Sequence, residues 1–376
     1  MKKIGLLTAL DPLDKTSWSG IYYKIYDTLK NEGFEVEILG PYPKNKNAER
    51  IIYIIEVFLK LFTKKRYYHH GTIVNSLFRG FYFSKRIKKS NCDVVLGLTS
   101  ATEFAFLKTN KPLIYFTDSS FGQISNYYST FSDVSMLSIS EANFLEKRTC
   151  KKVKYVIYPS LWAKSYCIEN YQVKADKVKV YKMGSNIDYP ITLNEFKSIN
   201  KSCIHFLFLG VDWERKGGEL VVKAVKNIKK LGYNVKLTIC GCSPQIQEDF
   251  VEIIPFLNKN DIDDYKKLQN LLIESHFLFL PTQAECYGIV FAEAAAYGLP
   301  SIAMNTGGVS SVVKDGESGF LLPENSDADA YVEKIVNLIN NPSKYEEMSK
   351  NSRKYFEEEL DWKNFGNNFK ILISNI

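Results

Sequence analysis

Short apolar runs alternate along the whole chain with stretches in which apolar positions recur every three or four residues. The runs predict buried strands, and the stretches between them predict helices that cover a sheet. In the first half, strands are predicted at Lys3–Ala9, Val36–Leu39, Asp93–Leu98, Leu113–Phe116, Val134–Ile139, Lys154–Tyr158 and Val178–Lys182, and a helix at Ile21–Glu32. In the second half, strands are predicted at Ile204–Leu209, Val235–Cys240, Val251–Ile254, Phe277–Leu280 and Ser301–Met304, and helices at Gly218–Leu231, Ile262–Ser275, Gly288–Tyr297 and Ala328–Ile339. This alternation predicts two doubly wound α/β sheets, each with its own core.

A polar stretch separates the two series. Residues 184–202 are rich in Gly, Asn, Pro and Ser, a composition that suits a linker. We therefore predict a first Rossmann-like domain at residues 1–183, a linker at 184–201 and a second Rossmann-like domain at 202–355. A length of 376 residues is about right for two domains.

Composition excludes several classes of protein. The chain is 45% hydrophobic and 24% charged, which excludes a disordered or collagen-like protein. Its longest apolar stretch, Ile51–Phe62, is interrupted by Glu56 and Lys60 and is too short to cross a bilayer. The N-terminal apolar run is shorter than a signal peptide requires. Seven scattered cysteines form neither a disulfide framework nor a zinc motif, so we expect a reduced, cytoplasmic protein without structural metal.

Positive charge is concentrated in residues 44–89. This segment holds 12 Lys or Arg against two Glu, a net +10, whereas the rest of the chain holds 37 against 40, a net −3. Basic residues alternate there with apolar and aromatic ones, which fits either a solvated helical face or a surface that rests on anionic lipid. Nucleic acid is a third interpretation, but no binding motif accompanies the patch, and we expect no nucleic-acid partner.

One strand-to-helix loop carries an unusual arrangement of carboxylates. Doubly wound sheets bind ligands beyond the carboxyl ends of their strands, and Gly288 begins a helix at such a place. The free N–H groups of the first turn, from Gly288 to Val290, could approach a phosphate closely. Glu285 precedes the helix and Glu293 lies on its second turn, where carboxylates could accept hydrogen bonds from sugar hydroxyls on both sides of a phosphate. The alternative is that the two are a helix cap and a surface charge.

Two further loops have features of phosphate sites. Arg215 and Lys216 adjoin Gly217 and Gly218 at the start of a predicted helix, where a forked guanidinium and a point charge suit a diphosphate. Taken alone, such a pair is an ordinary surface feature. In the first domain, the loop Ser17–Gly20 precedes a helix and resembles a smaller phosphate-facing turn.

These residues occur in an ordered set that resembles a known family. The Glu285-x7-Glu293 pattern within ECYGIVFAEAAAYGLP, followed by NTGGVSSVVKDGESGFLLP, resembles the signature of retaining glycosyltransferases of family 4. FLFLGVDWERKGG, VYKMGSNID and YPSLWAKSYCIENY extend the similarity over most of the chain from about residue 155. The resemblance implies the GT-B fold, in which two tandem Rossmann-like domains face an interdomain cleft. It also implies that a C-terminal crossover helix, within residues 356–376, packs back on the first domain with Trp362 as a core anchor.

The resemblance assigns the donor nucleotide-sugar to residues 202–355 and the acceptor to residues 1–183. Glu285 would hydrogen-bond the donor sugar, and Glu293 the ribose. Arg215 and Lys216 would neutralise the diphosphate as it leaves, when negative charge grows. The remaining donor-binding residues implied are Gly20, Cys286, Tyr287, Gly288, Ile289 and Val290, while Thr306, Gly307 and Gly308 would shape the rim.

Two positions depart from the family pattern. Many relatives carry an arginine where this chain has Val211 and Asp212. Relatives often carry a histidine in the stretch that reads IYFTDSSFGQ here, which offers Asp118 instead. We expect Asp118 to contact acceptor or donor sugar, with a cap on the following helix as its alternative. His205 and His276 lie in or beside predicted strands, and we expect them to be structural.

The resemblance implies a hexosyltransferase-type enzyme that needs neither metal nor cofactor. It would move a sugar with retention from a UDP- or GDP-sugar, its co-substrate, to a saccharide, polysaccharide or lipid-linked acceptor in cell-envelope or surface glycan biosynthesis. We expect it in the cytoplasm, peripheral on the inner face of the cell membrane. The alternatives are a GT-B nucleotide-sugar epimerase and an inactive partner subunit. A nicotinamide enzyme would want Gly-x-Gly-x-x-Gly after its first strand, and neither domain has it.

Overall fold

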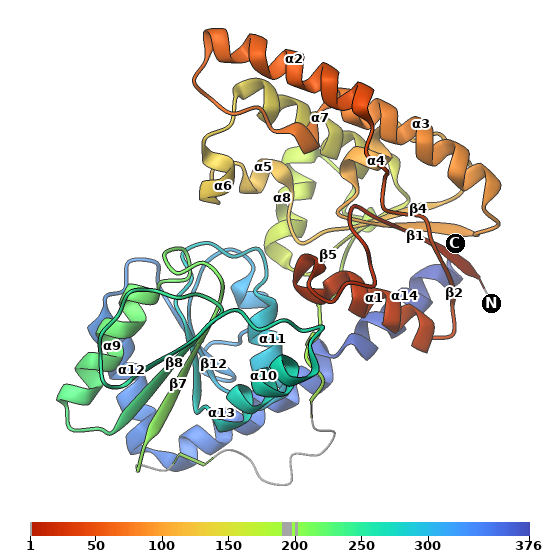
Figure 1. The fold of residues 1–376 in the computed structure, drawn as a ribbon. Coiled ribbons are helices and arrows are strands. Elements are labelled where there is room, and N and C mark those ends of the chain that lie inside the picture. Colours follow the sequence, from red (N-terminus) through yellow and green to blue (C-terminus); the bar gives the residue numbers. More distant parts are fainter. Residues whose placement is uncertain (1, 190–197, 200–201) are drawn as a thin grey trace. The chain divides into compact units, whose positions relative to one another are not determined.

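The protein consists of two compact units, each with its own sheet. The structure, a computed structural model, describes residues 2–189, 198–199 and 202–376. Unit 1 comprises Met1–Tyr181 and Gly366–Ile376, and unit 2 comprises Lys182–Phe365. Each unit contains a six-stranded sheet with helices packed on it (Figure 1). The prediction of two tandem doubly wound α/β domains is therefore confirmed.

Unit 1 has the strand order β2-β1-β3-β4-β5-β6, and every neighbouring pair is parallel. The strands are β1 (Lys3–Thr8), β2 (Glu35–Ile38), β3 (Val94–Leu98), β4 (Leu113–Phe116), β5 (Tyr155–Tyr158) and β6 (Val178–Val180). The inner strands β1, β3, β4 and β5 are mostly apolar and buried, as strands covered on both faces must be, whereas the edge strands β2 and β6 carry charged residues. The order reverses between β1 and β3, so the loops after these two strands diverge at the carboxyl edge of the sheet.

Four helices of unit 1 begin at side chains that satisfy free backbone N–H groups. Asn45, Thr72, Ser135 and Ser160 each accept a hydrogen bond from the first turn of a helix. The helices are α1 (Ile21–Asn31), α2 (Lys46–Phe62), α3 (Ile73–Lys89), α4 (Ala101–Ala105), α5 (Phe121–Ile124), α6 (Ser129–Ser132), α7 (Met136–Lys152) and α8 (Leu161–Tyr171). The strand predicted at Val134–Ile139 is wrong. The Ser135 side chain accepts from Ser138 N and starts α7 there.

Unit 2 repeats the plan with the order β12-β11-β10-β7-β8-β9, again parallel throughout. Its strands are β7 (Ile204–Leu209), β8 (Val235–Cys240), β9 (Val251–Ile254), β10 (Phe277–Leu280), β11 (Ser301–Met304) and β12 (Gly319–Leu322), and its helices are α9 (Gly218–Lys230), α10 (Ile262–Glu274), α11 (Ile289–Ala296), α12 (Ala328–Asn340) and α13 (Pro342–Tyr355). The sequence did not predict β12. Gly319 permits its pairing, because a Cβ there would lie 2.1 Å from Ser301 O.

A π-helical turn, Phe356–Leu360, leads into the last helix, α14 (Trp362–Ser374). In unit 2, buried Trp362 donates from Nε1 to Ser185 O at 3.0 Å. Residues 366–376 belong to unit 1, where the rings of Phe369 and Phe34 lie 5.9 Å apart. The units change between Tyr181 and Lys182, just before the predicted linker at 184–201. Within that linker, residues 190–197 and 200–201 lie outside the described residues.

Candidate functional site

The sheet of unit 2 reverses its strand order between β7 and β10. These strands are adjacent and parallel, with Phe277 opposite Phe206. The loop after β7, residues 210–217, and the loop after β10, residues 281–288, therefore leave the same edge of the sheet side by side. Open α/β sheets bind ligands at this kind of reversal. It is where the sequence places its unusual carboxylates and cations.

The start of α11 is shaped by Gly288. This glycine is the N-cap of the helix and has a φ of +86°, in the left-handed region that favours glycine. A Cβ there would lie 2.5 Å from the ring of Phe291 and 3.2 Å from Cγ of Glu285. Because Ile289 and Val290 are in the first turn, their N–H groups have no partner within the helix. The turn thus offers backbone donors at the positive end of a helix dipole.

Lys216 and Glu285 form an ion pair across the two loops. Lys216 Nζ donates to Glu285 Oε2, and Nη1 of Arg215 lies 3.7 Å from the same oxygen. The side chains of Lys216 and Glu285 are only 10% and 13% exposed. The loops meet closely at Gly217, whose φ is +76° and where a Cβ would lie 2.5 Å from Pro281 O. Two cations therefore share one carboxylate next to the free amides of α11.

Arg215 is held in place by its neighbours. Its Nε donates to Asp212 Oδ2 at 3.0 Å, and its Nη1 donates to Ala284 O at 2.9 Å. Asp212 is one of the two residues that depart from the family pattern in the sequence. In this chain the carboxylate of Asp212 fixes the guanidinium of Arg215, and the position does not provide a second guanidinium.

The backbone around Glu285 is fixed from several sides. Gly308 N donates to Glu285 O at 3.1 Å, and Thr306 Oγ1 donates to Gln283 O at 3.3 Å, so the rim residues of the next loop brace this one. The hydroxyl of Tyr287 donates to Met183 O at 2.8 Å, and burial raises its pKa well above the usual value. Cys286 is also buried. The side chains of Cys286 and Tyr287 are thus part of the packing, and only their backbone is available to a ligand.

Glu293 has a partner that the sequence did not indicate. Its side chain is 4% exposed, and its Oε1 accepts from Lys259 Nζ at 2.6 Å. Lys259 lies in the polar loop after β9, where nothing distinguishes it from a surface lysine. Burial of a carboxylate requires such a partner, because an unpaired charge would be costly away from water.

Gly20 lies at the corresponding strand reversal of unit 1. It is the N-cap of α1 with a φ of +92°, and it ends a 3-10 turn, Ser17–Gly20, in which Trp18 and Ser19 also have positive φ. Two consecutive non-glycine residues in this region store backbone strain, which clusters at functional sites. The ring of Trp18 holds the turn by packing 5.8 Å from that of Phe116.

Asp118 lines a small cavity at the carboxyl ends of β3 and β4 in unit 1. The cavity has a volume of about 210 Å³, and Glu146 of α7 lines it as well. Glu146 Oε2 accepts from Phe121 N at 2.6 Å, and Oε1 accepts from Tyr115 OH at 3.2 Å. Burial raises the pKa of Glu146 to about 7. The N-cap of the following helix, α5, is Ser120, two residues after Asp118.

Both histidines of the second half are structural, as predicted. His205 Nε2 lies 2.7 Å from Thr238 Oγ1, and burial lowers the pKa of His205 to about 4. Nδ1 of His276 accepts from His205 N at 3.0 Å. In the part of the chain that the structure describes, no group of three or more His, Cys, Asp or Glu is arranged to hold a metal ion.

The structure brings together, within unit 2, the loops that carry the predicted donor-site residues. These are Arg215, Lys216, Glu285, Cys286, Tyr287, Gly288, Ile289, Val290 and, on the next turn, Glu293. Gly20 and Asp118 belong to unit 1, each at the carboxyl edge of its own sheet. None of the described helices is both long and apolar enough to pass through a bilayer.

Comparison with known proteins places the chain in a family. The model "Glycosyltransferase Family 4" matches residues 22–189, and the model "Glycosyl transferases group 1" matches residues 192–355. An uncharacterised glycosyltransferase of Methanocaldococcus jannaschii is 30% identical over 161 residues, which are 42% of this chain and 44% of that protein. The capsular polysaccharide biosynthesis glycosyltransferase CapM of Staphylococcus aureus is 34% identical over 153 residues, 39% of each chain. The alignments thus span less than half the length of these curated relatives.

Solved glycosyltransferase-type structures have the same fold as this chain over nearly its full length. Sucrose-phosphate synthase from Thermosynechococcus elongatus has a TM-score of 0.71 at 17% identity, with 100% of this chain and 99% of that chain covered. WaaG, a glycosyltransferase involved in lipopolysaccharide biosynthesis, has a TM-score of 0.61 at 14% identity, with 97% and 98% covered. From the two family models, which lie side by side along the sequence, and from these folds, we conclude that the chain belongs to glycosyltransferase family 4 and has the GT-B fold.

Proposed function

We propose that this protein is a retaining glycosyltransferase that moves a hexose from a UDP- or GDP-sugar to a saccharide, polysaccharide or lipid-linked acceptor. The observation that carries the proposal is the ion pair of Lys216 and Glu285 beside the first turn of α11, with Arg215 held 3.7 Å from the same carboxylate. Cations, free amides and a carboxylate within one small region suit a diphosphate that is linked to a sugar. Family membership supports the same reaction class.

The donor would bind by exchanging partners at this ion pair. The N–H groups of Ile289 and Val290 would hold the diphosphate, and the ammonium of Lys216 would turn from Glu285 to a phosphate oxygen. Glu285 would then be free to accept hydrogen bonds from hydroxyls of the donor sugar. Glu293, one helical turn further on, would accept from the ribose in exchange for part of its contact with Lys259.

The transfer breaks the bond from the anomeric carbon to the phosphate oxygen and forms one to the acceptor oxygen on the same face. The proton of the acceptor hydroxyl would pass to the departing phosphate. Negative charge grows on the diphosphate during this step, so Arg215 and Lys216 would stabilise the transition state more than the ground state. In this proposal the chain's own cations serve the leaving group, and the reaction needs neither metal nor cofactor.

We also propose where the acceptor binds in unit 1 and where the protein acts in the cell. Asp118 lines a cavity at the carboxyl edge of unit 1, where a sugar hydroxyl could reach its carboxylate, and the strained turn that ends at Gly20 would face the donor phosphates. The basic segment 44–89 supports an acceptor at an anionic membrane, with the protein peripheral on its inner, cytoplasmic face. CapM and WaaG, by their names, serve polysaccharide and lipopolysaccharide biosynthesis, which is the setting we propose here.

A donor screen tests the proposal. Thermal unfolding of the full chain with UDP, GDP, ADP and their sugars should identify one nucleotide that raises Tm by mass action. Release of that nucleotide from its sugar, with and without saccharide acceptors, then reports turnover. We expect Glu285→Gln to abolish transfer while it retains most of the nucleotide affinity. Glu347→Gln, an exposed carboxylate on α13, is the matched control. Full turnover in Glu285→Gln, or no response to any nucleotide, contradicts the proposed function.

A further inference from the structure

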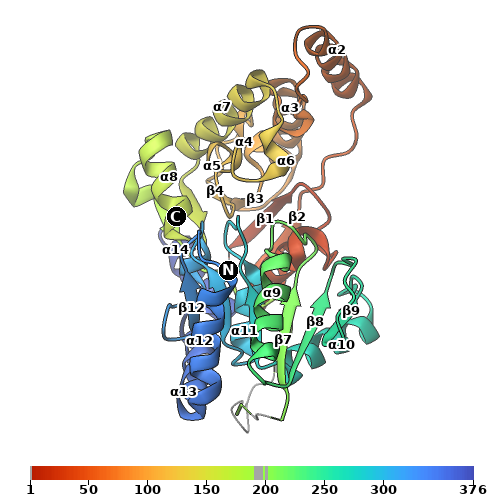
Figure 2. The same ribbon diagram turned by 90° about the vertical axis from the view of Figure 1, so that its left-hand side faces the viewer.

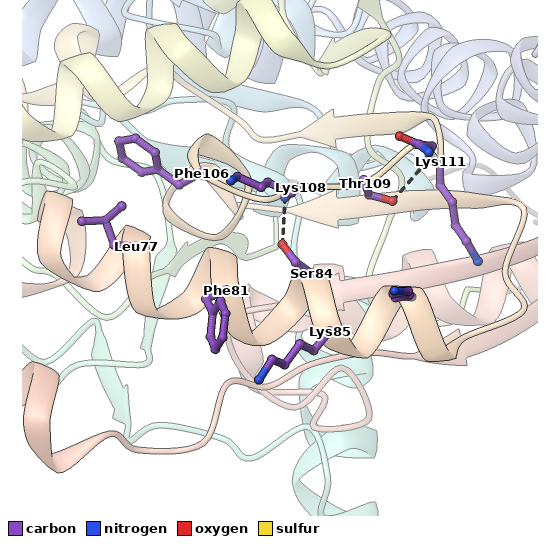
Figure 3. A pocket seen from close by; sticks show the side chains of 10 residues that line it. Leu77, Phe81, Ser84, Lys85, Phe106, Lys108, Thr109 and Lys111 are labelled. Atoms are coloured by element: carbon purple, nitrogen blue, oxygen red, sulfur yellow. Dashed lines mark hydrogen bonds between the residues drawn. The ribbon is translucent and has the colours of Figure 1, made fainter.

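A groove of about 960 Å³ runs along α3 in unit 1, from Leu77 to Lys88 (Figure 3). Its other side is the loop of residues 106–111, which leads into the amino end of β4. Gly80 lets this loop approach the helix, because a Cβ there would lie 2.8 Å from the carbonyl carbon of Phe106. Ser84 Oγ then accepts from Lys108 N at 2.8 Å. The groove is therefore held by fixed contacts at the edge of the sheet opposite Asp118.

The groove is lined by four lysines and by no carboxylate. Lys108 extends from the loop and Lys85 from the helix (Figure 3). Lys88 follows one turn after Lys85 on α3 and also lines the groove. Lys85, Lys88 and Lys108 are exposed and have no ion-pair partner within the described part of the chain. The fourth, Lys111, donates from Nζ to Ser90 O at 2.7 Å and to a second carbonyl. Uncompensated positive charge around one hollow favours an anionic ligand.

Apolar surface accompanies the charge. The ring of Phe81 is 64% exposed at the groove, and Lys85 Nζ lies 4.2 Å from its centroid. One turn earlier on the same stripe of α3, Leu77 is 50% exposed. A ligand that combines an anionic group with hydrocarbon would satisfy both features, whereas a free inorganic anion would use only the lysines.

The neighbouring helix α2 is an independent observation that points to the same ligand. Only Ala48 and Ile52 of its 17 residues are buried. Phe58, Leu61 and Phe62 are 59%, 75% and 72% exposed, and Ile51 and Ile54 extend the same apolar stripe. Figures 1 and 2 both show α2 at the outer edge of unit 1, beside α3. Water is an unfavourable environment for so much apolar surface on one helix.

We propose that this face of unit 1 docks on a bilayer of anionic phospholipid. The apolar stripe of α2 enters the interface, and the groove between α3 and residues 106–111 receives the phosphate headgroup of a lipid. The net charge of +10 on residues 44–89 matches such a surface. A second copy of the chain fits less well, because a symmetric contact would set this positive face against itself. A soluble acidic saccharide would leave the apolar residues of α2 uncovered.

This docking surface rests on the proposed membrane location and assigns it to the groove and to α2. Vesicle binding tests it without any measurement of turnover. Full-length protein is sedimented with phosphatidylcholine vesicles that contain phosphatidylglycerol, and with phosphatidylcholine alone. The variant Lys85→Gln/Lys88→Gln/Lys108→Gln should bind the anionic vesicles about 100-fold more weakly, at about 1 kcal/mol for each lysine. Its matched control is Lys223→Gln/Lys266→Gln/Lys344→Gln, which removes three exposed lysines from unit 2 and should bind like wild type.

A second pair of variants tests the apolar half of the surface. Phe58→Gln/Leu61→Gln should also weaken binding to the anionic vesicles, whereas Leu231→Gln/Phe256→Gln, with two similarly exposed side chains in unit 2, should not. Far-UV circular dichroism and Tm check that each variant is folded. Equal binding by the groove variant and its control overturns the inference. Saturable binding of soluble glycerol phosphate or dextran sulfate at the groove, without any binding to vesicles, would also overturn it. So would a dimer in solution that dissociates when α2 is substituted.

Release of nucleotide from the donor sugar in detergent-free buffer separates this inference from the proposed function. The groove variants should retain it, because the groove lies at the opposite sheet edge of unit 1 from Asp118. Loss of vesicle binding with donor turnover retained would support the docking surface. Vesicle binding by a protein without any turnover would leave the docking surface standing and contradict only the proposed chemistry.

Discussion

Replacement of Lys216 by methionine isolates the electrostatic part of the candidate donor site. Methionine keeps most of the side-chain volume and removes the ammonium that contacts Glu285. A hydrogen bond to a charged group contributes roughly 1.5–3 kcal/mol. Loss of one such bond to a diphosphate at about 2 kcal/mol corresponds to a roughly 30-fold rise in Kd. The carboxylate of Glu285 adds to this loss, because only Arg215, 3.7 Å away, then neutralises it beside the incoming phosphates.

The ion pair predicts an order of affinities among variants and not only a single loss. Lys216→Met should bind the nucleoside diphosphate most weakly, because it combines a missing cation with an unscreened anion. Lys216→Met/Glu285→Gln should recover part of the affinity, since the repulsion is gone. Isothermal titration calorimetry on wild type, both single variants and the double variant measures the coupling directly. Lys344→Met, an exposed lysine of α13, is the matched control.

Two results would contradict the proposed contacts of Lys216 and Glu285 with the diphosphate. If Lys216→Met binds the nucleotide like wild type, the ammonium does not contact the diphosphate. If the double variant binds no better than Lys216→Met, Glu285 does not lie close enough to the phosphates to repel them, and the exchange of partners at the ion pair is wrong. The coupling should also shrink at high salt, although less than for an exposed pair, because both side chains are largely buried.

Two further predictions concern buried carboxylates. Lys259→Met leaves the nearly buried Glu293 without its cation and should destabilise unit 2 by about 3–5 kcal/mol, seen as a lower Tm, and the added change Glu293→Gln should restore most of it. An unchanged Tm would show that Glu293 is solvated. Burial raises the pKa of Glu146 from 4.5 to about 7, so between these pH values the folded unit holds a proton that the unfolded chain has lost. Its stabilising contribution is therefore full below pH 4.5 and is lost as the pH rises to 7, by about 3 kcal/mol. Glu146→Gln should remove this fall in Tm between pH 5 and pH 8, and an unaltered pH dependence would exclude Glu146 as its source.

The strands were predictable because both sheets are parallel and covered on both faces. Runs such as Ile204–Leu209 and Phe277–Leu280 are apolar at every position or nearly so, and they end where polar loops begin. The error at Val134–Ile139 has the opposite origin. Val134 makes only an isolated bridge to Arg66, and the residues after it are apolar enough to resemble a strand. The hydrogen bond from Ser138 N to the Ser135 side chain caps a helix there instead. A local hydrogen bond thus outweighs a weak strand pattern.

Strand β12 was missed for a different reason. The segment Gly319–Leu322 follows a turn and begins with a glycine, so only three apolar residues mark it. It exists because β11 lies beside it and because the missing side chain of Gly319 lets its backbone approach Ser301 O. Pairing with a distant segment, not local preference, creates this strand, and such pairing is invisible in a single sequence.

The candidate site likewise combines features that a single sequence reveals with contacts that only the fold creates. Residues whose role depends on local backbone were identifiable: Gly288 stands where a helix must begin in the left-handed region, and Glu285 and Glu293 keep fixed spacing around it. Lys216 was also identifiable from its loop, but its pairing with Glu285 and the partner of Glu293 were not. Lys216 and Glu285 are 69 positions apart, and Lys259 reaches Glu293 across 34. Only the adjacency of β7 and β10 brings the first pair together.

These partners decide what the carboxylates can do. A lone Glu285 beside a phosphate site would oppose binding of the donor, and a lone buried Glu293 would oppose folding. With Lys216 and Lys259 in place, each carboxylate is paired with a cation. In the proposed function, each cation would then turn to a phosphate or stay in place when a hydroxyl binds. The sequence patterns identify Glu285, Glu293 and Lys216, but not how these side chains pair. The pairings are set by topology, and in the proposed function they allow two otherwise unfavourable carboxylates to accompany a phosphate that carries a sugar on either side.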